Sequence, residues 1–430
     1  MYIAVDAMGG DYAPGAVVEG AVSASREYGI EVLLVGNRDR ILHELERVQA
    51  KESSLLAIQH ATETISMSDS PAAAVRNKRD SSLHVAFKHV KSGNAGAVVS
   101  AGNSGAVLAL AITSLGRLKG VERPAIVTVL PTLGQRACLI DSGANVECKP
   151  QHLVQFAIMG EVYARVVRGI RYPRIGVLSN GEEDSKGTEA TRVAHEILGK
   201  LSLNYIGYIE GRDLNSGNVD VIVTDGFTGN VALKTMEGFY DFLHAQLRSL
   251  FTANWQGKLA YLLLRRSFAD LRASLDTDEI GGAPLLGTKG LPIIAHGASS
   301  PKAIKNAIRL ADESVRRGVN DQIIENLHAL SETAFLTAEL KRGGRNLWTH
   351  IRDRFRHRDG QGTESPPVSH PSARADTPEF DTHRQPTPAS HQRPNGHAGQ
   401  DPTGSTDQTP GFARSHSGHT PDQKEEEHHK

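Results

Sequence analysis

The sequence has very little cysteine and no long apolar run. Its 430 residues include two cysteines, Cys138 and Cys148. Two thiols exclude a disulfide framework, and their spacing matches no zinc-binding pattern, so we expect both to be packing residues. No stretch reaches the roughly 18 apolar residues of a transmembrane helix. The N-terminus begins directly with a strand pattern and lacks the basic region and apolar core of a signal peptide, so we expect a cytoplasmic protein.

The sequence also lacks an excess of charge and several catalytic motifs. A formal net charge of −1 creates no strong field that would attract nucleic acid. The dinucleotide fingerprint G-x-G-x-x-G and the nucleotide loop G-x-x-x-x-G-K-[ST] are absent from the turns, so NAD and nucleoside triphosphates are not supported. There is no G-x-S-x-G elbow at a strand end and no H-E-x-x-H. If the protein is an enzyme, we expect its substrate to supply the nucleophile. We also expect no cofactor and no bound metal.

The composition changes abruptly at Asp359. From there to Lys430 the chain is rich in Pro, His, Ser, Thr, Gly and Gln and almost empty of Leu, Ile and Val. Such a segment buries too little apolar surface to offset its ordering entropy. We therefore expect a catalytic domain over residues 1–358 and a disordered low-complexity tail over 359–430, whose scattered histidines are better explained by solvation than by metal binding.

Before Asp359, short β-rich runs alternate with helical patterns. The predicted strands, read from the sequence, are Tyr2–Ala7, Glu31–Gly36, Gly96–Ala101, Ala125–Leu130, Arg174–Ser179, Asn204–Ile209, Val219–Asp225 and Leu291–His296. The predicted helices include Ala16–Tyr28, Ala72–Lys91, Gly105–Leu118 and Pro150–Arg168. Continuous apolar strands separated by helices indicate an α/β fold with parallel strands covered on both faces.

Four of the turns that follow these strands are rich in glycine and polar residues. They are Met8–Asp11, Gly102–Gly105, Asn180–Thr188 and Asp225–Asn230. In parallel sheets ligands collect at the carboxyl ends of strands. The N-terminus of a helix offers free backbone N–H groups and a partial positive charge, and glycine lets an anion approach closely. Each turn alone is also ordinary capping chemistry, but several in one chain, one of them with Lys186, favour a site for a phosphate-type anion.

Eight segments of the sequence resemble the PlsX family, the phosphate acyltransferases of bacterial phospholipid synthesis. In family order and between Met1 and Arg342 they are "AVDAMGGDYAP", "SAGNSGA", "DSGANVECKP", "NGEEDSKGTE", "YIEGRDL", "DGFTGNVALKTMEG", "EIGGAPLLGTKG" and "HGASSPKAI". The resemblance implies transfer of a fatty acyl group from acyl carrier protein to inorganic phosphate, giving acyl phosphate. It also implies a homodimer and a three-layer α/β/α sandwich with a mostly parallel sheet, similar in architecture to phosphate acetyltransferases. One departure is that Ser179 stands where related sequences commonly have Asn, and Asn180 follows it.

This chemistry agrees with a site built of turns. Free phosphate is already an oxyanion near neutral pH and needs placement more than deprotonation. A thiol with a pKa of about 8.5 leaves without a strong acid. We predict that Lys186 acts electrostatically toward phosphate or the oxyanion and that Asn230 and Thr228 supply donors at the helix start after Asp225.

Other parts of the site are predicted with alternatives. Gly102, Asn103 and Ser104 form another part of the anion cradle. His296 donates to the carbonyl or the leaving sulfur, or is simply a capping or core histidine. Asp225, like Asp6 and Asp11, could equally be a turn-forming residue.

The segment Leu247–Phe268 carries an apolar stripe at helical spacing together with basic residues. The predicted contacts with an anionic membrane are Trp255, Leu259, Leu262 and Leu263. Acyl phosphate would be handed over at this membrane, and a downstream glycerol-phosphate acyltransferase is a candidate partner. A core or dimer-interface helix explains the same stripe. Gly257 is predicted to break the segment into two short helices.

Three other functions remain open on the sequence alone. They are a phosphate acyltransferase that uses coenzyme A thioesters, a dehydrogenase of related architecture, which the missing fingerprint disfavours, and a non-catalytic membrane scaffold for lipid synthesis enzymes.

Overall fold

The structure is a computed structural model that describes residues 1–332, without the side chains of residues 269–275, 277 and 330–332. The predicted boundary at Asp359 and the predicted tail lie outside the described residues.

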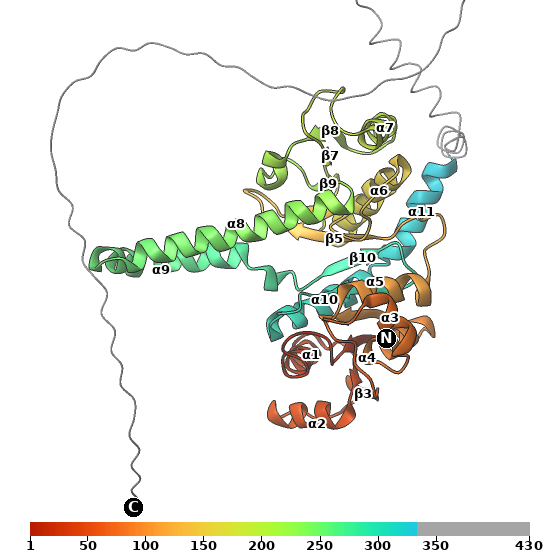
Figure 1. Cartoon of the computed structure of the whole chain (residues 1–430), viewed down its shortest axis with the longest axis vertical. Coiled ribbons are helices and arrows are strands. Elements are labelled where there is room, and N and C mark those ends of the chain that lie inside the picture. The colour runs from red at the N-terminus through yellow and green to blue at the C-terminus, as the bar shows by residue number, and fades with distance from the viewer. Residues whose placement is uncertain (333–430) are drawn as a thin grey trace, which may run out of the picture. The chain divides into compact units, whose positions relative to one another are not determined.

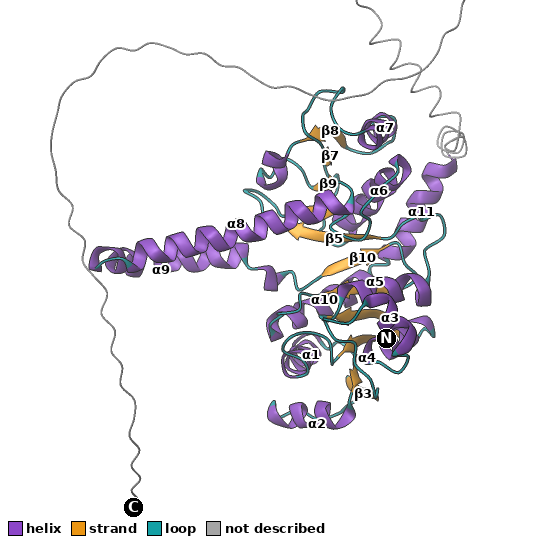
Figure 2. Ribbon diagram, in the orientation of Figure 1, coloured by secondary structure: helices purple, strands orange, loops and turns teal. Residues whose placement is uncertain are grey.

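Eleven strands of the described chain form one sheet (Figures 1 and 2). In their order across the sheet they are β3 (Leu56–His60), β2 (Val32–Gly36), β1 (Tyr2–Asp6), β4 (Ala95–Ser100), β11 (Leu291–Ile294), β10 (Ala283–Leu286), β5 (Ala125–Leu130), β6 (Ala137–Ile140), β9 (Val221–Val223), β7 (Ile175–Leu178) and β8 (Tyr205–Ile209).

The sheet consists of two parallel blocks joined by antiparallel pairs. β3, β2, β1, β4 and β11 are parallel to one another, and so are β6, β9, β7 and β8. Between the blocks, β10 is antiparallel to both β11 and β5, and β5 is antiparallel to β6. The prediction of a mostly parallel sheet is confirmed. Three strands of the structure, β3, β6 and β10, are not among the predicted ones.

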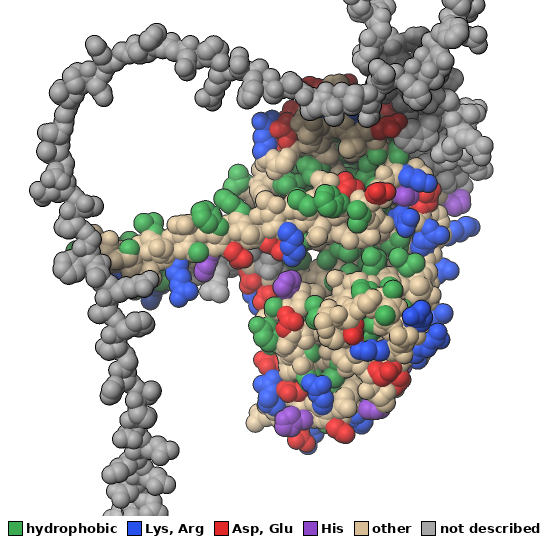
Figure 3. Space-filling view, in the orientation of Figure 1, with side chains coloured by type: hydrophobic (Ala, Val, Ile, Leu, Met, Phe, Trp, Pro, Cys, Tyr) green, Lys and Arg blue, Asp and Glu red, His purple; other side chains and the backbone are tan. Residues whose placement is uncertain are grey.

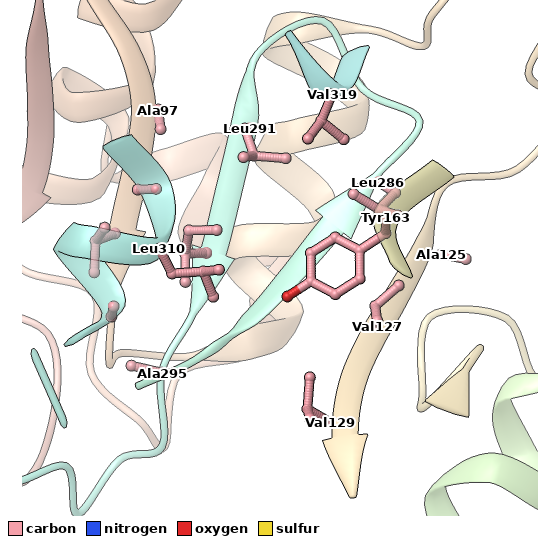
Figure 4. Close-up of a cluster of buried hydrophobic side chains, with 14 of the residues drawn as sticks. Ala97, Ala125, Val127, Val129, Tyr163, Leu286, Leu291, Ala295, Leu310 and Val319 are labelled. Atoms are coloured by element: carbon pink, nitrogen blue, oxygen red, sulfur yellow. The ribbon is translucent and has the colours of Figure 1, made fainter. Parts of the chain in front are cut away.

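Helices cover both faces of the sheet, so the predicted α/β/α layering is confirmed. One face packs against α1 (Gly15–Tyr28), α2 (Arg38–Arg47), α6 (Pro150–Val166), α7 (Glu189–Leu198), α10 (Pro301–Arg316) and α11 (Val319–Glu332). The other face packs against α3 (Pro71–Asn77), α4 (Ser82–Lys91), α5 (Ser104–Leu110) with the π-helical turn Ala111–Leu115 that follows it, the 3-10 helix Gly211–Asn215 and the first turns of α8 (Gly226–Thr252). Figure 4 shows the first of these interfaces, with the ring of Tyr163 from α6 lying near Val127 and Leu286.

Two predicted helices are interrupted in the structure. The predicted helix Ala72–Lys91 is two helices, α3 and α4, because the hydroxyl of Ser81 accepts from the backbone N–H of His84 and starts a new helix there. The predicted helix Gly105–Leu118 is α5 followed by the π-helical turn, which ends at Gly116 in a positive-φ conformation.

The chain continues from α8 into α9 (Trp255–Leu275), and the two helices form a long antiparallel arm that extends from the body (Figure 1). The prediction that Gly257 breaks this segment into two short helices is wrong. The break falls at Ala253–Asn254, where the Asn254 side chain accepts from the Gly257 N–H at 2.8 Å and starts α9. Gly257 instead allows close packing, because a Cβ there would lie 2.8 Å from the carbonyl oxygen of Leu250. A short 3-10 helix, Thr277–Glu279, then leads to β10.

Candidate active site

The polar turns gather in two places, because the two parallel blocks point in opposite directions along the sheet. β1, β4 and β11 are neighbours, so their carboxyl ends bring together the turns at 7–11, 101–105 and 295–300. β6, β9 and β7 are also neighbours and bring together the turns at 141–149, 224–230 and 179–188. We call these the first and second loop clusters.

A buried aspartate organises the first loop cluster. Asp6, at the end of β1, is 3% exposed, and its carboxylate accepts hydrogen bonds from the Ser100 hydroxyl at 2.8 Å and the Met8 N–H at 3.3 Å. The Ser100 oxygen in turn accepts from the backbone N–H of Gly102 at 3.1 Å. Burial raises the pKa of Asp6, and the hydrogen bonds from Ser82 and Ser100 oppose this rise. Asp6 therefore fixes the turn that leads into α5.

Glycine at position 9 is required by the contact between two turns. A Cβ on Gly9 would lie 2.4 Å from Oδ2 of Asp6 and 2.9 Å from the backbone nitrogen of Gly102. No real side chain fits at such distances, so the turn after β1 can lie against the turn after β4 only when this residue is glycine.

The side chain of Asn103 holds the start of α5 in place. Its oxygen accepts from the Ala106 N–H at 3.1 Å, and its amide nitrogen donates to the carbonyl oxygens of Ser66, Met67 and Asp69 at 3.4, 3.3 and 3.0 Å. These contacts occupy the Asn103 side chain, so its contribution to an anion cradle is the orientation of the helix start.

The start of α5 still offers hydrogen-bond donors. Within the described chain, the backbone N–H groups of Ser104 and Gly105 meet no acceptor, and the exposed Ser104 hydroxyl has no partner. Free N–H groups at the start of a helix attract anions. Of the predicted cradle residues, Ser104 is thus the one that is free to meet a ligand.

His296 lies in the same cluster, in the turn after β11. Its Nδ1 accepts from the Ala298 N–H at 3.2 Å, which assigns the proton of the neutral ring to Nε2. The next carbonyl, of Gly297, accepts from the Asp11 N–H at 2.8 Å and ties this turn to the turn after β1. His296 is exposed, so the alternative of a core histidine does not hold, and its Nε2–H is available as a donor.

A second buried aspartate organises the second loop cluster. Asp141 follows β6, and its carboxylate accepts from the N–H groups of Ile126, Gly143, Ala144 and Asn145 at 3.0, 3.2, 3.0 and 2.7 Å. These N–H groups point at the protein's own carboxylate, so they are not available to a bound anion. Asp141 begins the family-like segment "DSGANVECKP", but no role was predicted for it. A signal was present, since Asp-Ser-Gly is typical turn chemistry, but β6 before it was not predicted as a strand.

The start of α8 is capped by Asp225. The two carboxylate oxygens accept from the Thr228 N–H and the Thr228 hydroxyl, both at 2.8 Å, and the Gly226 N–H donates to the Asn145 carbonyl at 2.7 Å. Asn230 is exposed and makes no side-chain hydrogen bond within the part of the chain that the structure describes. It lies over Gly143, where a Cβ would come within 3.8 Å of it. Asn230 is therefore the free polar side chain of this helix start.

Lys186 lies in the loop after β7. The Asn180 side chain closes this loop by accepting from the Gly187 N–H at 2.9 Å, which gives the departure from the family pattern a structural role. The Lys186 ammonium lies 3.9 Å from the Glu183 carboxylate, and 43% of the side chain is exposed. The described structure shows no contact between Lys186 and Asn230.

The predicted site residues thus fall into two groups. Gly102, Asn103, Ser104 and His296 belong to the first loop cluster, and Asp225, Thr228, Asn230 and Lys186 belong to the second. From β11 to β6 the sheet crosses three strand spacings, or roughly 14 Å at about 4.8 Å per strand. Between them, Ile126 and Thr128 of the central strand β5 face the second helix layer but are only partly buried. The helix layer is therefore incomplete above β5, between α5 and α8.

The described chain offers no reactive thiol and no cluster of metal ligands. Burial raises the pKa of both Cys138 and Cys148 to about 12, so neither thiol is a nucleophile near neutral pH. Over residues 1–332, no three described His, Cys, Asp or Glu side chains lie close enough to hold a metal ion. In the same range, no helix is long and apolar enough to cross a bilayer.

Comparison with known proteins decides the family. A family model described as "Fatty acid synthesis protein" matches residues 1–322. The phosphate acyltransferase of Geobacter sulfurreducens is 53% identical over 327 residues, which cover 76% of this chain and 94% of the relative. The chain belongs to the PlsX family of phosphate acyltransferases. The phosphate acyltransferase of Pelobacter propionicus is also 53% identical, with the same coverage of both chains.

A solved structure shares the fold of this phosphate acyltransferase. A phosphotransacetylase from Streptococcus pyogenes superposes with a TM-score of 0.51 and 17% sequence identity, over 74% of this chain and 94% of that one. The predicted likeness in architecture to phosphate acetyltransferases is confirmed. A phosphate acyltransferase needs to hold phosphate and to stabilise charge on an acyl carbonyl, and this chain presents two polar loop clusters beside an incompletely covered strand.

Proposed function

We propose that this phosphate acyltransferase moves a fatty acyl group from acyl carrier protein to inorganic phosphate, giving acyl phosphate for phospholipid synthesis. The observation that carries the proposal is the open start of α5, where the Ser104 and Gly105 N–H groups and the Ser104 hydroxyl have no partner in the described chain. Phosphate binds at such helix starts. The start of α8 suits phosphate less, because the carboxylate of Asp225 already occupies it.

In the proposed reaction, a phosphate oxygen attacks the thioester carbonyl carbon, and the carbon–sulfur bond breaks as the tetrahedral intermediate collapses. The thiolate that leaves takes up a proton, since a thiol pKa of about 8.5 lies above neutral pH. No side-chain nucleophile is required. The protein holds phosphate beside the carbonyl and stabilises the oxyanion, tasks for which one well-placed donor is typically worth about 10²–10³ in rate.

We assign the polar side chains to these tasks as follows. His296, with Nε2–H free, donates to the leaving sulfur or the carbonyl from the phosphate side. Asn230 donates to the oxyanion from the second loop cluster, and the capping pair Asp225 and Thr228 fixes the helix start that carries it. Lys186, which is loosely paired and half exposed, supplies positive charge toward phosphate or the oxyanion once substrate is bound.

We further propose that the arm of α8 and α9 makes a homodimer contact and a peripheral membrane contact, in a protein of the cytoplasm. Trp255 and Leu263 are 72% and 76% exposed, and Leu259 and Leu262 are exposed as well, so this stripe is not core within one chain. Figure 3 shows apolar side chains along the arm. Such a surface suits a bilayer interface or a partner chain, and a downstream glycerol-phosphate acyltransferase would receive the product there.

Substitution of Leu259 and Leu263 by glutamate separates these two contacts. We expect loss of co-sedimentation with anionic liposomes and retention of the dimer. A variant that still sediments with liposomes but runs as a monomer would identify the stripe as a dimer interface alone.

Thiol release tests the reaction itself. Purified protein is incubated with phosphate and either an acyl carrier protein thioester or an acyl coenzyme A thioester. Phosphate-dependent release from the carrier thioester supports the proposal. Release from the coenzyme A thioester alone would identify the coenzyme A alternative, and no release from either would favour a non-catalytic membrane scaffold.

A further inference from the structure

Five exposed cationic side chains lie at the ends of the central strands β4, β11, β10 and β5 that are opposite to the first loop cluster. They are Lys91, Arg117, Lys119, Arg123 and Lys289, which we call the cationic patch. Figure 3 shows Lys and Arg side chains along the flank of the body on the right of the view, beside α5 and α11. The segments 116–123 and 287–290 join these residues into one surface.

Backbone contacts show that the patch is continuous. The Lys289 N–H donates to the Gly116 carbonyl at 2.9 Å, next to Arg117. The neighbouring Leu118 N–H donates to the Gly287 carbonyl, also at 2.9 Å. A Cβ at Gly290 would lie 2.5 Å from the side chain of Val90, which adjoins Lys91 at the end of α4.

The five cations of the patch form no ion pair with another described residue, although one carboxylate, that of Glu122, lies in the same segment and is 3.2 Å from Nε2 of His152. The Arg117 guanidinium donates to the backbone carbonyl of Glu122, not to its carboxylate. Elsewhere many basic side chains are paired, as Arg174 is with Asp220 at 2.9 Å. Five cations against one carboxylate leave the patch with a net positive charge, which creates a local positive potential. That potential attracts an acidic macromolecule.

The patch borders the second loop cluster. Arg123 precedes Pro124, whose carbonyl accepts from the Asn145 side chain at 2.7 Å, and the Ile126 N–H binds Asp141. Arg123 lies three positions before Ile126, which is at most about 11 Å of extended chain. A macromolecule docked on the patch can therefore pass a flexible arm along β5 toward Asn230.

We propose that the cationic patch docks the acidic carrier protein that presents the acyl thioester. The inference rests on the proposed acyl carrier donor. A membrane suits the patch less well, because most of the exposed large apolar side chains that insertion needs lie on α8 and α9 instead. Charge complementarity of this kind accelerates encounter and is weakened by salt.

A double charge reversal tests the patch. Lys119→Glu with Lys289→Glu is compared with Arg40→Glu with Lys51→Glu, a matched control of two exposed residues without ion pairs in the described structure, at the other end of the sheet. Initial rates are measured with an acyl carrier protein thioester and with an acyl-pantetheine thioester, which lacks the protein. We expect the patch variant to raise KM for the carrier thioester about tenfold at low salt, with little change for acyl-pantetheine.

The outcomes distinguish this inference from the proposed function. If wild-type protein does not use the carrier thioester, the proposed donor is wrong and the inference falls with it. If wild-type protein uses it and the patch variant keeps the wild-type KM, the patch does not dock the carrier. Loss of liposome binding at an unchanged KM would assign the patch to the membrane. An equal rise of KM in the control variant would show an effect of net charge alone and would also overturn the inference.

Discussion

Replacing Gly9 by alanine tests whether the buried carboxylate of Asp6 sets the geometry of the phosphate cradle. The added Cβ would lie 2.4 Å from Asp6 Oδ2, whereas ordinary contact begins at 3.4 Å, so the carboxylate or the turn must move by 1.0 Å (3.4 − 2.4). The hydrogen bond from Ser100 to this oxygen is 2.8 Å long. A displacement of 1.0 Å directly away stretches it to 3.8 Å, beyond hydrogen-bonding distance.

Two magnitudes follow from this displacement. Loss of a buried hydrogen bond to a charged group lowers the free energy of unfolding by about 1.5–3 kcal/mol. Ser100 also accepts from the Gly102 N–H, so the same movement shifts the start of α5. A misplacement of about 1 Å can cost on the order of 10²-fold in rate. We expect kcat/KM for phosphate to fall by about that factor.

The assay follows thiol release at saturating acyl thioester while phosphate is varied, with thermal unfolding measured in parallel. Gly211→Ala is the matched control, since a Cβ at Gly211 meets nothing within 4 Å. If Gly9→Ala unfolds at the wild-type temperature and keeps the wild-type KM for phosphate, the link from Asp6 through Ser100 to α5 is refuted.

Three further outcomes are expected. Lys186→Ala lowers turnover but not the melting temperature, because its pairing is long and exposed; wild-type turnover at saturating phosphate would exclude the assigned role. Asn230→Ala reduces kcat more than Asn180→Ala does, and equal losses in a side-by-side assay would contradict this. Burial would raise the pKa of Asp220, but hydrogen bonds from Arg174 hold it below its ordinary value, so this pair stabilises the fold above about pH 4 and the contribution is lost as the pH falls further. Asp220→Asn should therefore lower the melting temperature at pH 7 and flatten its decline between pH 5 and pH 2, and parallel curves would contradict this.

Local chemistry made much of the fold predictable. An apolar run followed by glycine and a capping residue predicts a strand, a turn and a helix. The turns after β1, β4, β7 and β9 follow this pattern. The helix starts at Asn103 and Asp225 carry the hydrogen bonds that their residue types predict.

The arrangement of the site was not predictable in the same way. Which turns meet depends on strand order and direction, and these depend on pairings such as that of β10 with β5, which joins residues far apart along the chain. The sequence therefore suggested one anion cradle where the structure has two loop clusters. The roles of Asp6 and Asp141 also depend on contacts with residues far away along the chain, such as Ser100 and Ile126, which no local pattern reveals.

The two helix starts differ in a way that suits a reaction with two centres of negative charge. Asn103 caps α5 with a neutral amide, so the positive end of that helix remains available to phosphate. Asp225 caps α8 with a carboxylate, which offsets that positive end but leaves the neutral Asn230 free. The carboxylate of Asp225 would repel a doubly charged phosphate. An oxyanion that forms only during the reaction needs a hydrogen-bond donor at this place, but no site that binds an anion before the reaction begins. On this reasoning the neutral cap marks the phosphate side and the charged cap marks the acyl side.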